Sequence, residues 1–143
     1  MLRIVLDTNV LISALLKPDS NPAIIVSLIL DGRVILCLSS EILAEYKGVL
    51  KRNKFKSLNQ AKVKQFLQEI EKKALWVEPR ESVKIIKADP EDNKFLECAQ
   101  AAQADYLVTG NIKHFSFKKF KSTKITTPYN FLNIMAKLFL NKL

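Results

Sequence analysis

Short apolar runs alternate with amphipathic stretches along the whole chain. Leu2–Leu6 is apolar except for one arginine, which is typical of a strand buried on both faces, and helical spacing follows over Thr8–Leu16. Four further runs predict strands, at Val34–Leu38, Trp76–Val77, Tyr106–Thr109 and Lys124–Thr126. Because helical patterns separate these strands, the sequence predicts an α/β fold whose parallel sheet is covered on both faces.

Capping and stop signals mark the other helices. Pro22 opens a helix that runs to Asp31 and that Gly32 closes, with proline in the first turn and glycine after the last. Ser39 or Ser40 caps a helix that continues to about Lys51. Three more helices are predicted, at Asn59–Leu75, from the cap Asp89 to about Gln103, and at Pro128–Leu140.

The composition excludes several classes of protein. With 143 residues, of which 48% are hydrophobic and 26% charged, we expect one globular domain over residues 1–143. The longest apolar run, Ala23–Leu30, is far shorter than the ~20 residues of a membrane span, and no secretory leader precedes Asp7. Cys37 and Cys98 lie far apart in apolar surroundings, which indicates buried free thiols of a cytoplasmic protein and not a zinc site.

The net charge of +9 favours a polyanionic partner, usually nucleic acid, although it also promotes solubility. Two segments carry much of this charge. Asn111–Lys124 contains five lysines interleaved with Phe115, Phe117 and Phe120, and Lys47–Lys56 forms the second basic group. The nucleic-acid interpretation requires both segments to flank one cleft.

Polar residues follow the predicted strands at the edge where parallel sheets bind ligands. Asp7 ends the first strand, and Asn111 comes shortly after the fourth. Glu45 borders the apolar stripe of the helix after the second strand, whereas Asp92 lies on the sheet-facing stripe of a later helix, where spacing does not separate it cleanly from Glu91. Each has a simpler alternative, namely a helix cap, a solvated charge or a turn former.

Together these residues predict a metal site. Clustered carboxylates repel one another and need a cation, and a set of oxygen ligands suits Mg²⁺ or Mn²⁺. Such a metal can bridge phosphate oxygens, lower the pKa of a bound water and stabilise a leaving oxygen. Asn9 could orient Asp7 or that water. With a basic rim to hold a polyanion, the inferred reaction is hydrolysis of phosphodiester bonds.

An ordered set of segments resembles the PIN-domain family from about Leu2 to Leu132. The segments are LDTNVLISALL, Glu45 in a later helix, DPEDNKFLECA and ADYLVTGN, and the likeness is greatest to the VapC-like toxin components of toxin–antitoxin pairs. The resemblance implies a three-layer α/β/α sandwich with a mostly parallel sheet of about five strands. It also implies a Mg²⁺- or Mn²⁺-dependent endoribonuclease, commonly a homodimer, that a cognate antitoxin blocks by docking over the acidic pocket.

The resemblance also assigns roles to individual residues. The family's first three acids, catalytic and metal-binding, fall on Asp7, Glu45 and Asp92, and Asn9 supports the first of them. Asn111 and His114 stand at the two positions where the family usually carries its fourth acid. Asn111 can still offer a carbonyl oxygen or hold a metal-bound water, so a second metal is expected to bind more weakly, or only with substrate phosphate. The residues expected to contact RNA are Lys113, His114, Lys118 and Lys119.

Three functions therefore remain open. The first is a ribonuclease toxin, and the second is a non-toxin PIN nuclease of RNA processing, which an antitoxin-sized reading frame upstream would distinguish. The third is an RNA-binding PIN domain without catalysis, which Asn111 favours and the retention of three mutually repelling acids opposes. A phosphatase of the haloacid dehalogenase type needs an acid two residues after Asp7, where this chain has Asn9.

Overall fold

The computed structural model describes residues 1–82, 90–115 and 117–142, so the predicted cap Asp89 lies outside the described residues. Within them the strands form a six-stranded sheet in the order β3-β2-β1-β4-β6-β5. The strands are β1 (Arg3–Leu6), β2 (Ile35–Leu38), β3 (Leu75–Trp76), β4 (Tyr106–Val108), β5 (Lys119–Phe120) and β6 (Thr123–Thr126). β5 pairs antiparallel with β6, and every other pairing in this sheet is parallel.

β1 lies in the middle of the sheet because it is apolar on both faces. Ile4, Val5 and Leu6 are fully buried, at 0% exposure each. Ile4 pairs with Leu36 of β2 on one side and with Tyr106 of β4 on the other. Since these strands are parallel, the carboxyl ends of β1 and β4 meet at one edge of the sheet, which is where ligands collect in open α/β folds.

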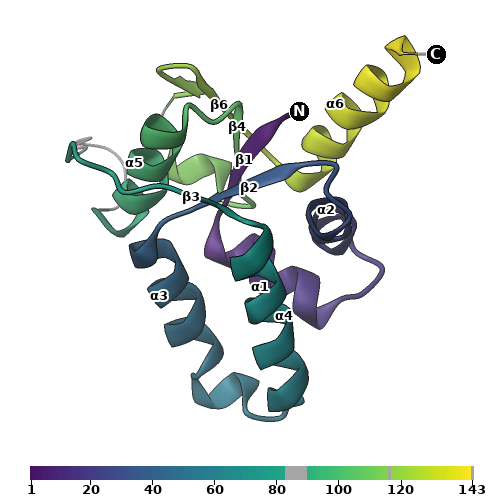
Figure 1. The fold of residues 1–143 in the computed structure, drawn as a ribbon, viewed down its shortest axis with the longest axis vertical. Helices are drawn as coiled ribbons and strands as arrows, with labels where there is room; N and C mark the ends of the chain where they lie inside the picture. Colours follow the sequence, from purple (N-terminus) through teal and green to yellow (C-terminus); the bar gives the residue numbers. More distant parts are fainter. Residues whose placement is uncertain (83–89, 116, 143) are drawn as a thin grey trace.

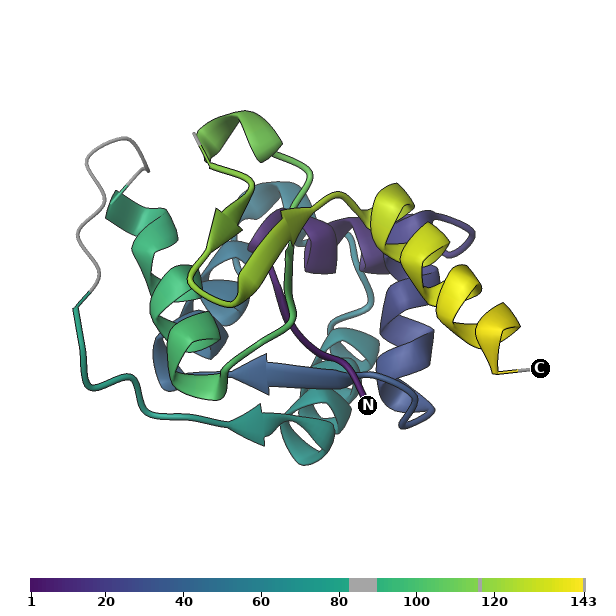
Figure 2. The ribbon, with the colours of Figure 1, turned by 90° about the horizontal axis from the view of Figure 1, so that it is seen from above.

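Six α-helices and three short 3₁₀ segments complete the described part of the fold. They are α1 (Thr8–Leu16), α2 (Asn21–Leu30), α3 (Ser40–Leu50), η1 (Asn53–Phe55), α4 (Gln60–Lys73), η2 (Pro90–Asp92), α5 (Asn93–Ala102), η3 (Ile112–His114) and α6 (Pro128–Asn141). Figure 1 shows α1, α3 and α4 below the sheet edge in that view, and Figure 2 shows α5 on one side of the strands with α2 and α6 on the other. This arrangement confirms the three-layer α/β/α sandwich.

Local signals account for several helix ends. Ser39 accepts a hydrogen bond from the Ile42 amide (3.3 Å), and Asn59 accepts from the amides of Ala61 and Lys62. Gly32 adopts a φ of +76° just after α2, a left-handed conformation that glycine takes without steric cost. Both the predicted serine cap and the predicted glycine stop are therefore confirmed.

Two details differ from the sequence expectation. β5 is a sixth strand that the pattern did not predict, because two residues are too few to show an alternation. The helix expected from Asp89 begins as η2 and becomes α-helical only at Asn93.

Cys37 and Cys98 are free and buried as expected, and burial raises the pKa of their thiols to about 11 and about 12. Among the described residues, no helix has the length and apolarity to cross a membrane.

Candidate active site

Asp7 occupies the junction between β1 and α1. Its amide donates to the carbonyl of Val108 in β4 (3.0 Å), and its own carbonyl accepts from the Val10 amide (3.0 Å) in the first turn of α1. The side chain forms no capping hydrogen bond. Its Oδ2 instead accepts a 2.7 Å hydrogen bond from Thr109 Oγ1. The carboxylate is therefore held chiefly by Thr109, in the segment after β4, and a cap of α1 alone does not explain it.

The surroundings of Asp7 oppose its negative charge. The residue is only 8% exposed, and this burial is the largest influence, raising the pKa of its carboxyl above the ordinary 3.8. The Thr109 hydroxyl and the amides of Asn9 and Thr8 lower the pKa, whereas the charge of Glu45 raises it. A cation beside Asp7 would favour the ionised form, so this carboxylate is suited to binding one.

Glu45, on α3, is held by contacts with two neighbouring side chains. Thr8 Oγ1 donates a hydrogen bond to Glu45 Oε2, and Lys94 Nζ forms an ion pair with Oε1 at 2.6 Å. Both partners of the ion pair are only 21% exposed. The next residue, Tyr46, is fully buried and donates from its hydroxyl to the Leu6 carbonyl (2.6 Å), which fixes α3 against the end of β1.

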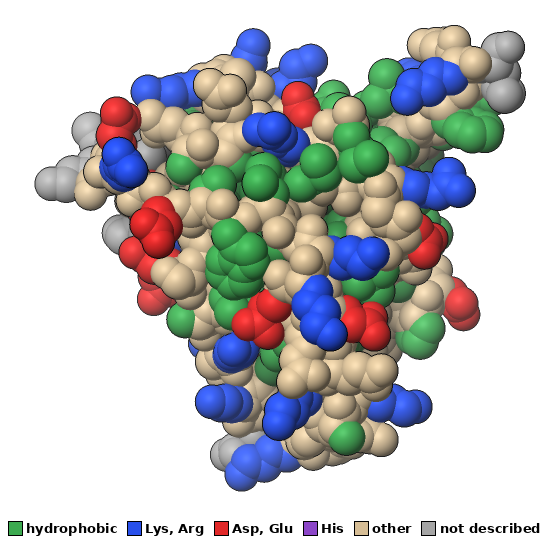
Figure 3. Space-filling model, viewed as in Figure 1, with side chains coloured by type: hydrophobic (Ala, Val, Ile, Leu, Met, Phe, Trp, Pro, Cys, Tyr) green, Lys and Arg blue, Asp and Glu red, His purple; other side chains and the backbone are tan. Residues whose placement is uncertain are grey.

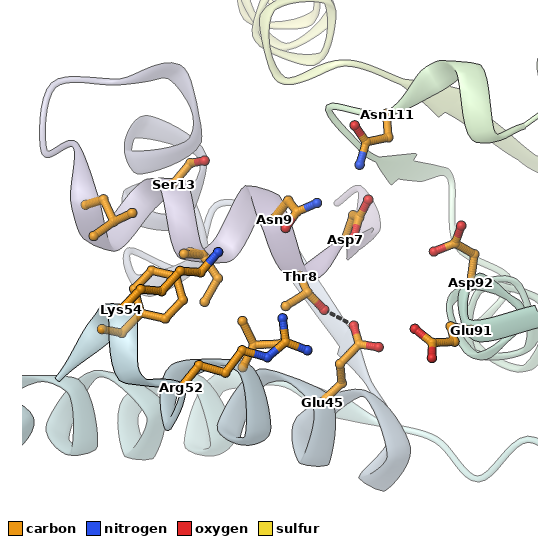
Figure 4. A pocket seen from close by; sticks show the side chains of 14 residues that line it. Asp7, Thr8, Asn9, Ser13, Glu45, Arg52, Lys54, Glu91, Asp92 and Asn111 are labelled. Carbon is orange, nitrogen blue, oxygen red and sulfur yellow. Dashed lines mark hydrogen bonds between the residues drawn. The ribbon is translucent and has the colours of Figure 1, made fainter. Parts of the chain in front are cut away.

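Asp92 and Asn111 approach from the opposite side. Asp92 ends η2 immediately before α5 and is partly buried, while Glu91 beside it is exposed. The Asn111 amide donates to Thr109 Oγ1 (3.0 Å), so one threonine hydroxyl connects Asn111 with Asp7. In Figure 4 the side chains of Asp7, Asp92 and Asn111 point toward the same opening, with Glu45 and Glu91 along its lower side.

These side chains line one cavity of about 580 Å³ at the carboxyl ends of β1 and β4. The acidic and amide residues in its wall are Asp7, Asn9, Glu45, Glu91, Asp92 and Asn111. The structure thus brings together the three acids and the two supporting residues that the sequence suggests. Glu91 joins them, which agrees with the ambiguous spacing of Glu91 and Asp92.

The donor set fits a hard divalent cation. In the described ranges, no three acidic, histidine or cysteine side chains are placed to hold one metal ion together. Mg²⁺, however, is usually held by one or two carboxylates and completes its octahedron with water and substrate phosphate. Asp7 and Asp92, with the carbonyl oxygen of Asn111, provide such a set. Glu45 is already engaged by Lys94 and Thr8.

The basic residues are divided between two places. Lys118 and Lys119 line a separate hollow with Tyr106 and Lys124 and do not line the acidic cavity. Lys113 is exposed in η3; His114 belongs to the same segment, and its side chain lies outside the described part of the chain. On the face shown in Figure 3, lysine and arginine side chains are scattered over several elements and do not form one patch.

Among the described residues, the basic side chains that line the acidic cavity are Arg52 and Lys54 of the other segment, whereas the Asn111–Lys124 segment reaches the cavity through Asn111. No described lysine of Asn111–Lys124 lines that cavity, so the described basic side chains of the two segments do not flank one cleft. The aromatic residues of the Asn111–Lys124 segment also have a structural role. Phe115 is buried, and Phe117 packs against it and against Phe120 with ring centroids 5.9 and 6.0 Å apart. These rings belong to the core and its border.

Four of the residues that shape the site were not singled out by the sequence. Thr8 and Thr109 lie within the DTN and VTGN segments, where their hydroxyls read as ordinary turn or helix-start groups. Tyr46 reads as part of an apolar stripe. Lys94 pairs with Glu45, which lies 49 positions earlier, and the spacing of neighbouring residues cannot predict a contact between such distant positions. Only Thr8 and Thr109, through their place beside polar strand ends, carried a signal that could have identified them.

Comparisons with known proteins bear on the family and the fold of this chain. The sequence profile described as PIN domain matches residues 3–113. An uncharacterized protein of Methanocaldococcus jannaschii is 28% identical over 112 residues, which cover 77% of this chain and 71% of the relative. A chain in the crystal structure of VapBC2 from Rickettsia felis, bound to a DNA fragment from their promoter, superposes with a TM-score of 0.59. That match covers 88% of this chain and 98% of the other at 23% identity, so it bears on the fold.

Proposed function

This chain belongs to the PIN-domain family, and from that premise we propose that it is a Mg²⁺- or Mn²⁺-dependent endoribonuclease, the toxin of a type II toxin–antitoxin pair. PIN domains are generally nucleases. The observation that carries the proposal is that Asp7, Glu45 and Asp92, from three distant parts of the sequence, line one cavity at the carboxyl edge of the sheet. Carboxylates so grouped suit a cation that acts on phosphate.

The residues of the cavity take distinct parts in the proposed reaction. Asp7 and Asp92 hold the cation, and Asn111 contributes its carbonyl oxygen or holds a water. When bound, the metal supplies positive charge to the scissile phosphate and lowers the pKa of a water molecule. Thr109 fixes the Asp7 carboxylate by its 2.7 Å hydrogen bond, and the Asn9 amide orients the same group or that water.

Glu45 and Lys94 act as a pair in this scheme. The Lys94 ammonium pairs with Glu45 and so offsets one of the negative charges beside Asp7. Thr8 holds the other oxygen of Glu45 and sets its direction. Held by these two contacts, Glu45 would orient a water molecule in the cavity, whereas Asp7 and Asp92 would hold the cation.

The charge of the chain supports a nucleic-acid substrate. A net charge of +9 attracts polyanions, and we propose that Lys113, His114, Lys118 and Lys119 contribute outer phosphate contacts that steer RNA to the molecule. Because Lys118 and Lys119 line a separate hollow, their proposed role is attraction at a distance and not contact with the scissile phosphate.

The toxin assignment rests on the neighbour in the structural comparison. That protein is part of VapBC2, and the shared fold supports a similar assembly here, with a cognate antitoxin and with a second copy of this chain. The buried free thiols of Cys37 and Cys98 support a cytoplasmic location. Co-expression with the reading frame immediately upstream, followed by co-purification, distinguishes a toxin from a PIN nuclease of RNA processing.

A cleavage assay tests the enzymatic part of the proposal. Purified chain, free of any partner, is incubated with end-labelled single-stranded RNA in Mg²⁺, Mn²⁺ or EDTA, and Asp92→Asn serves as the control for contaminating nucleases. Cutting that needs metal and disappears in Asp92→Asn supports the proposal. Equal cutting by both proteins shows that the observed activity does not come from this site.

One observation favours a second candidate. Asn111, in the segment after β4, lines the cavity without bringing a charge to it, so a domain that binds RNA without cutting it is the alternative. Binding of RNA without cleavage in either metal supports that alternative. Asn111→Asp is then the variant to test for restored activity.

A further inference from the structure

We propose that the end of the cavity away from Asp7 and Asp92 is a subsite for the nucleotide next to the scissile phosphate. Arg52 and Lys54 bind the backbone phosphate of that nucleotide, and apolar side chains of α1, α3 and η1 receive its base. The inference rests on the proposed function, because it takes the acidic end as the place of cleavage.

Two cations face this part of the cavity. Arg52 lies just after α3 and Lys54 within η1, and both are exposed residues that line the cavity wall. In Figure 4 they extend from the lower left toward the opening, across from Asp92 and Glu91. Among the ion pairs within the described ranges, none includes Arg52 or Lys54. Their charges are therefore available to an anion that enters from solvent.

An apolar wall lies beside these cations. It consists of Ile12, Leu16, Val49 and Phe55. Ile12 and Phe55 are 6% exposed and form a fixed floor, whereas Leu16 is 46% exposed at the end of α1. Lys54 Nζ lies 5.1 Å from the centroid of the Phe55 ring, a cation–π contact that holds the ammonium beside the apolar wall.

A nucleotide matches this combination better than other anions do. Its phosphate needs cations, and its base needs an apolar surface, which single-strand-binding proteins provide side by side. An acidic peptide would satisfy Arg52 and Lys54 but offers no base to Leu16. An isolated inorganic anion would leave the apolar wall exposed.

The size of the cavity fits the same interpretation. Its volume of about 580 Å³ lies within the ~300–1,000 Å³ typical of ligand sites. The acidic and the basic residues line the same continuous space. A single strand laid along it places one phosphate at the acids and the next beside Arg52 and Lys54.

The test compares three charge reversals. Arg52→Glu and Lys54→Glu alter the subsite, and Lys56→Glu is the matched control, since Lys56 is exposed in the same segment and does not line the cavity. Binding of a fluorescent single-stranded RNA is measured by anisotropy in EDTA over a range of salt. Cleavage of the same RNA in Mn²⁺ gives KM and kcat, and circular dichroism confirms that each variant is folded.

We expect Arg52→Glu and Lys54→Glu to raise KM and Kd by about tenfold or more, with kcat changed much less, because each removes a phosphate contact outside the reacting centre. Each also reduces the slope of log affinity against log salt by about one. Lys56→Glu should change both constants by less than about threefold, in keeping with general electrostatics alone. Leu16→Ser, a change at an exposed position, should raise KM with little effect on the salt slope.

A dinucleoside monophosphate separates the subsite from the catalytic centre, because its one phosphate occupies the acidic end. The three charge-reversal variants should cut it equally, because the phosphate that Arg52 and Lys54 would bind is missing from it. If Arg52→Glu and Lys54→Glu behave like Lys56→Glu on long RNA, the subsite is overturned while cleavage by the unaltered chain still supports the nuclease. If the unaltered chain binds RNA without cutting it, and the two variants lose that binding, the nuclease proposal fails, and Arg52 and Lys54 form an RNA-binding site but not a subsite beside a cleavage centre. If the unaltered chain neither binds nor cuts RNA, both proposals are overturned.

Discussion

The two basic segments look alike in the sequence and differ in their place in the fold. Arg52 and Lys54 of the first line the acidic cavity, whereas Lys118 and Lys119 of the second line a hollow beside Tyr106 and Lys124. The difference arises because the first segment follows α3, which Tyr46 fixes to the end of β1, while the second forms the antiparallel margin of the sheet. A lysine-rich segment therefore indicates a polyanion, and only the topology shows which lysines lie beside the chemistry.

The largest effect on RNA cleavage should come from removing one of the acids that line the cavity. Asp7→Asn should lower RNA cleavage by at least about 100-fold, since even groups that only orient metal ligands are worth ~10–100-fold. Asp105→Asn is the matched control, because Asp105 is exposed and accepts from the Arg3 amide (2.9 Å) at the opposite end of the strands. Equal losses in the two variants would show that the cavity has no special role.

A smaller loss is expected when the cation beside the acids is removed. Lys94→Ala leaves Glu45 with Thr8 as its remaining described partner and should lower kcat by about tenfold, within the range of residues that orient ligands. Lys94→Arg keeps the ion pair and should retain most of the activity. Steady-state kinetics in Mn²⁺ measure both variants, and an Arg variant as poor as the Ala variant would contradict the positioning role.

Changing the lysines at the antiparallel margin of the sheet should weaken RNA binding only slightly. The double variant Lys118→Ala and Lys119→Ala should weaken RNA binding by about two- to fivefold at low salt and leave kcat unchanged, because exposed charges steer RNA and are screened at high salt. Anisotropy at two salt concentrations measures the effect. A fall in kcat would place these lysines at the reacting centre, contrary to their separate hollow.

The smallest effect concerns stability. Because burial raises the pKa of Asp7, the folded chain retains a proton at pH values where the unfolded chain has lost it, so ionised Asp7 lowers stability as the pH rises through the raised pKa. In EDTA, Asp7→Asn should therefore have a slightly higher Tm than the unaltered chain at neutral pH. The difference should disappear as the pH falls toward the ordinary value of 3.8. A lower Tm for Asp7→Asn at neutral pH would contradict this sign.

Much of the fold could be predicted from the sequence because its local signals agree with one another. Three elements are specified without reference to distant residues: β1 by its apolar run, α3 by its serine cap, and α2 by Pro22 at its start and Gly32 after its end. Asp7 and Asn111 could be placed at one edge because strands of a parallel sheet end together. β5 could not be predicted, since its two residues pair only after the turn at Lys121, which adopts a φ of +52°.

The chemistry of the site was predicted less completely, because its decisive contacts are long-range. The Thr109–Asp7 hydrogen bond spans 102 positions and the Lys94–Glu45 ion pair spans 49. Periodicity places Glu45 at the border of the apolar stripe of α3, but it does not reveal what meets this acid there. Asp92 ends η2, just before α5, and so lies outside the helical stripe on which the sequence pattern put it. The phenylalanines near the second basic segment show the converse, because a pattern that favoured a nucleic-acid surface also describes residues that pack on the core.

The rate of RNA cleavage as a function of Mn²⁺ concentration, measured for the unaltered chain and for Asp7→Asn, tests the central claim most directly. The account predicts no cleavage in EDTA, a saturable rise with Mn²⁺ for the unaltered chain, and almost no rise for Asp7→Asn at any concentration. Cleavage that persists in EDTA, or that Asp7→Asn retains with the same dependence on Mn²⁺, would show that the cavity lined by Asp7 and Asn111 is not a metal-dependent nuclease centre.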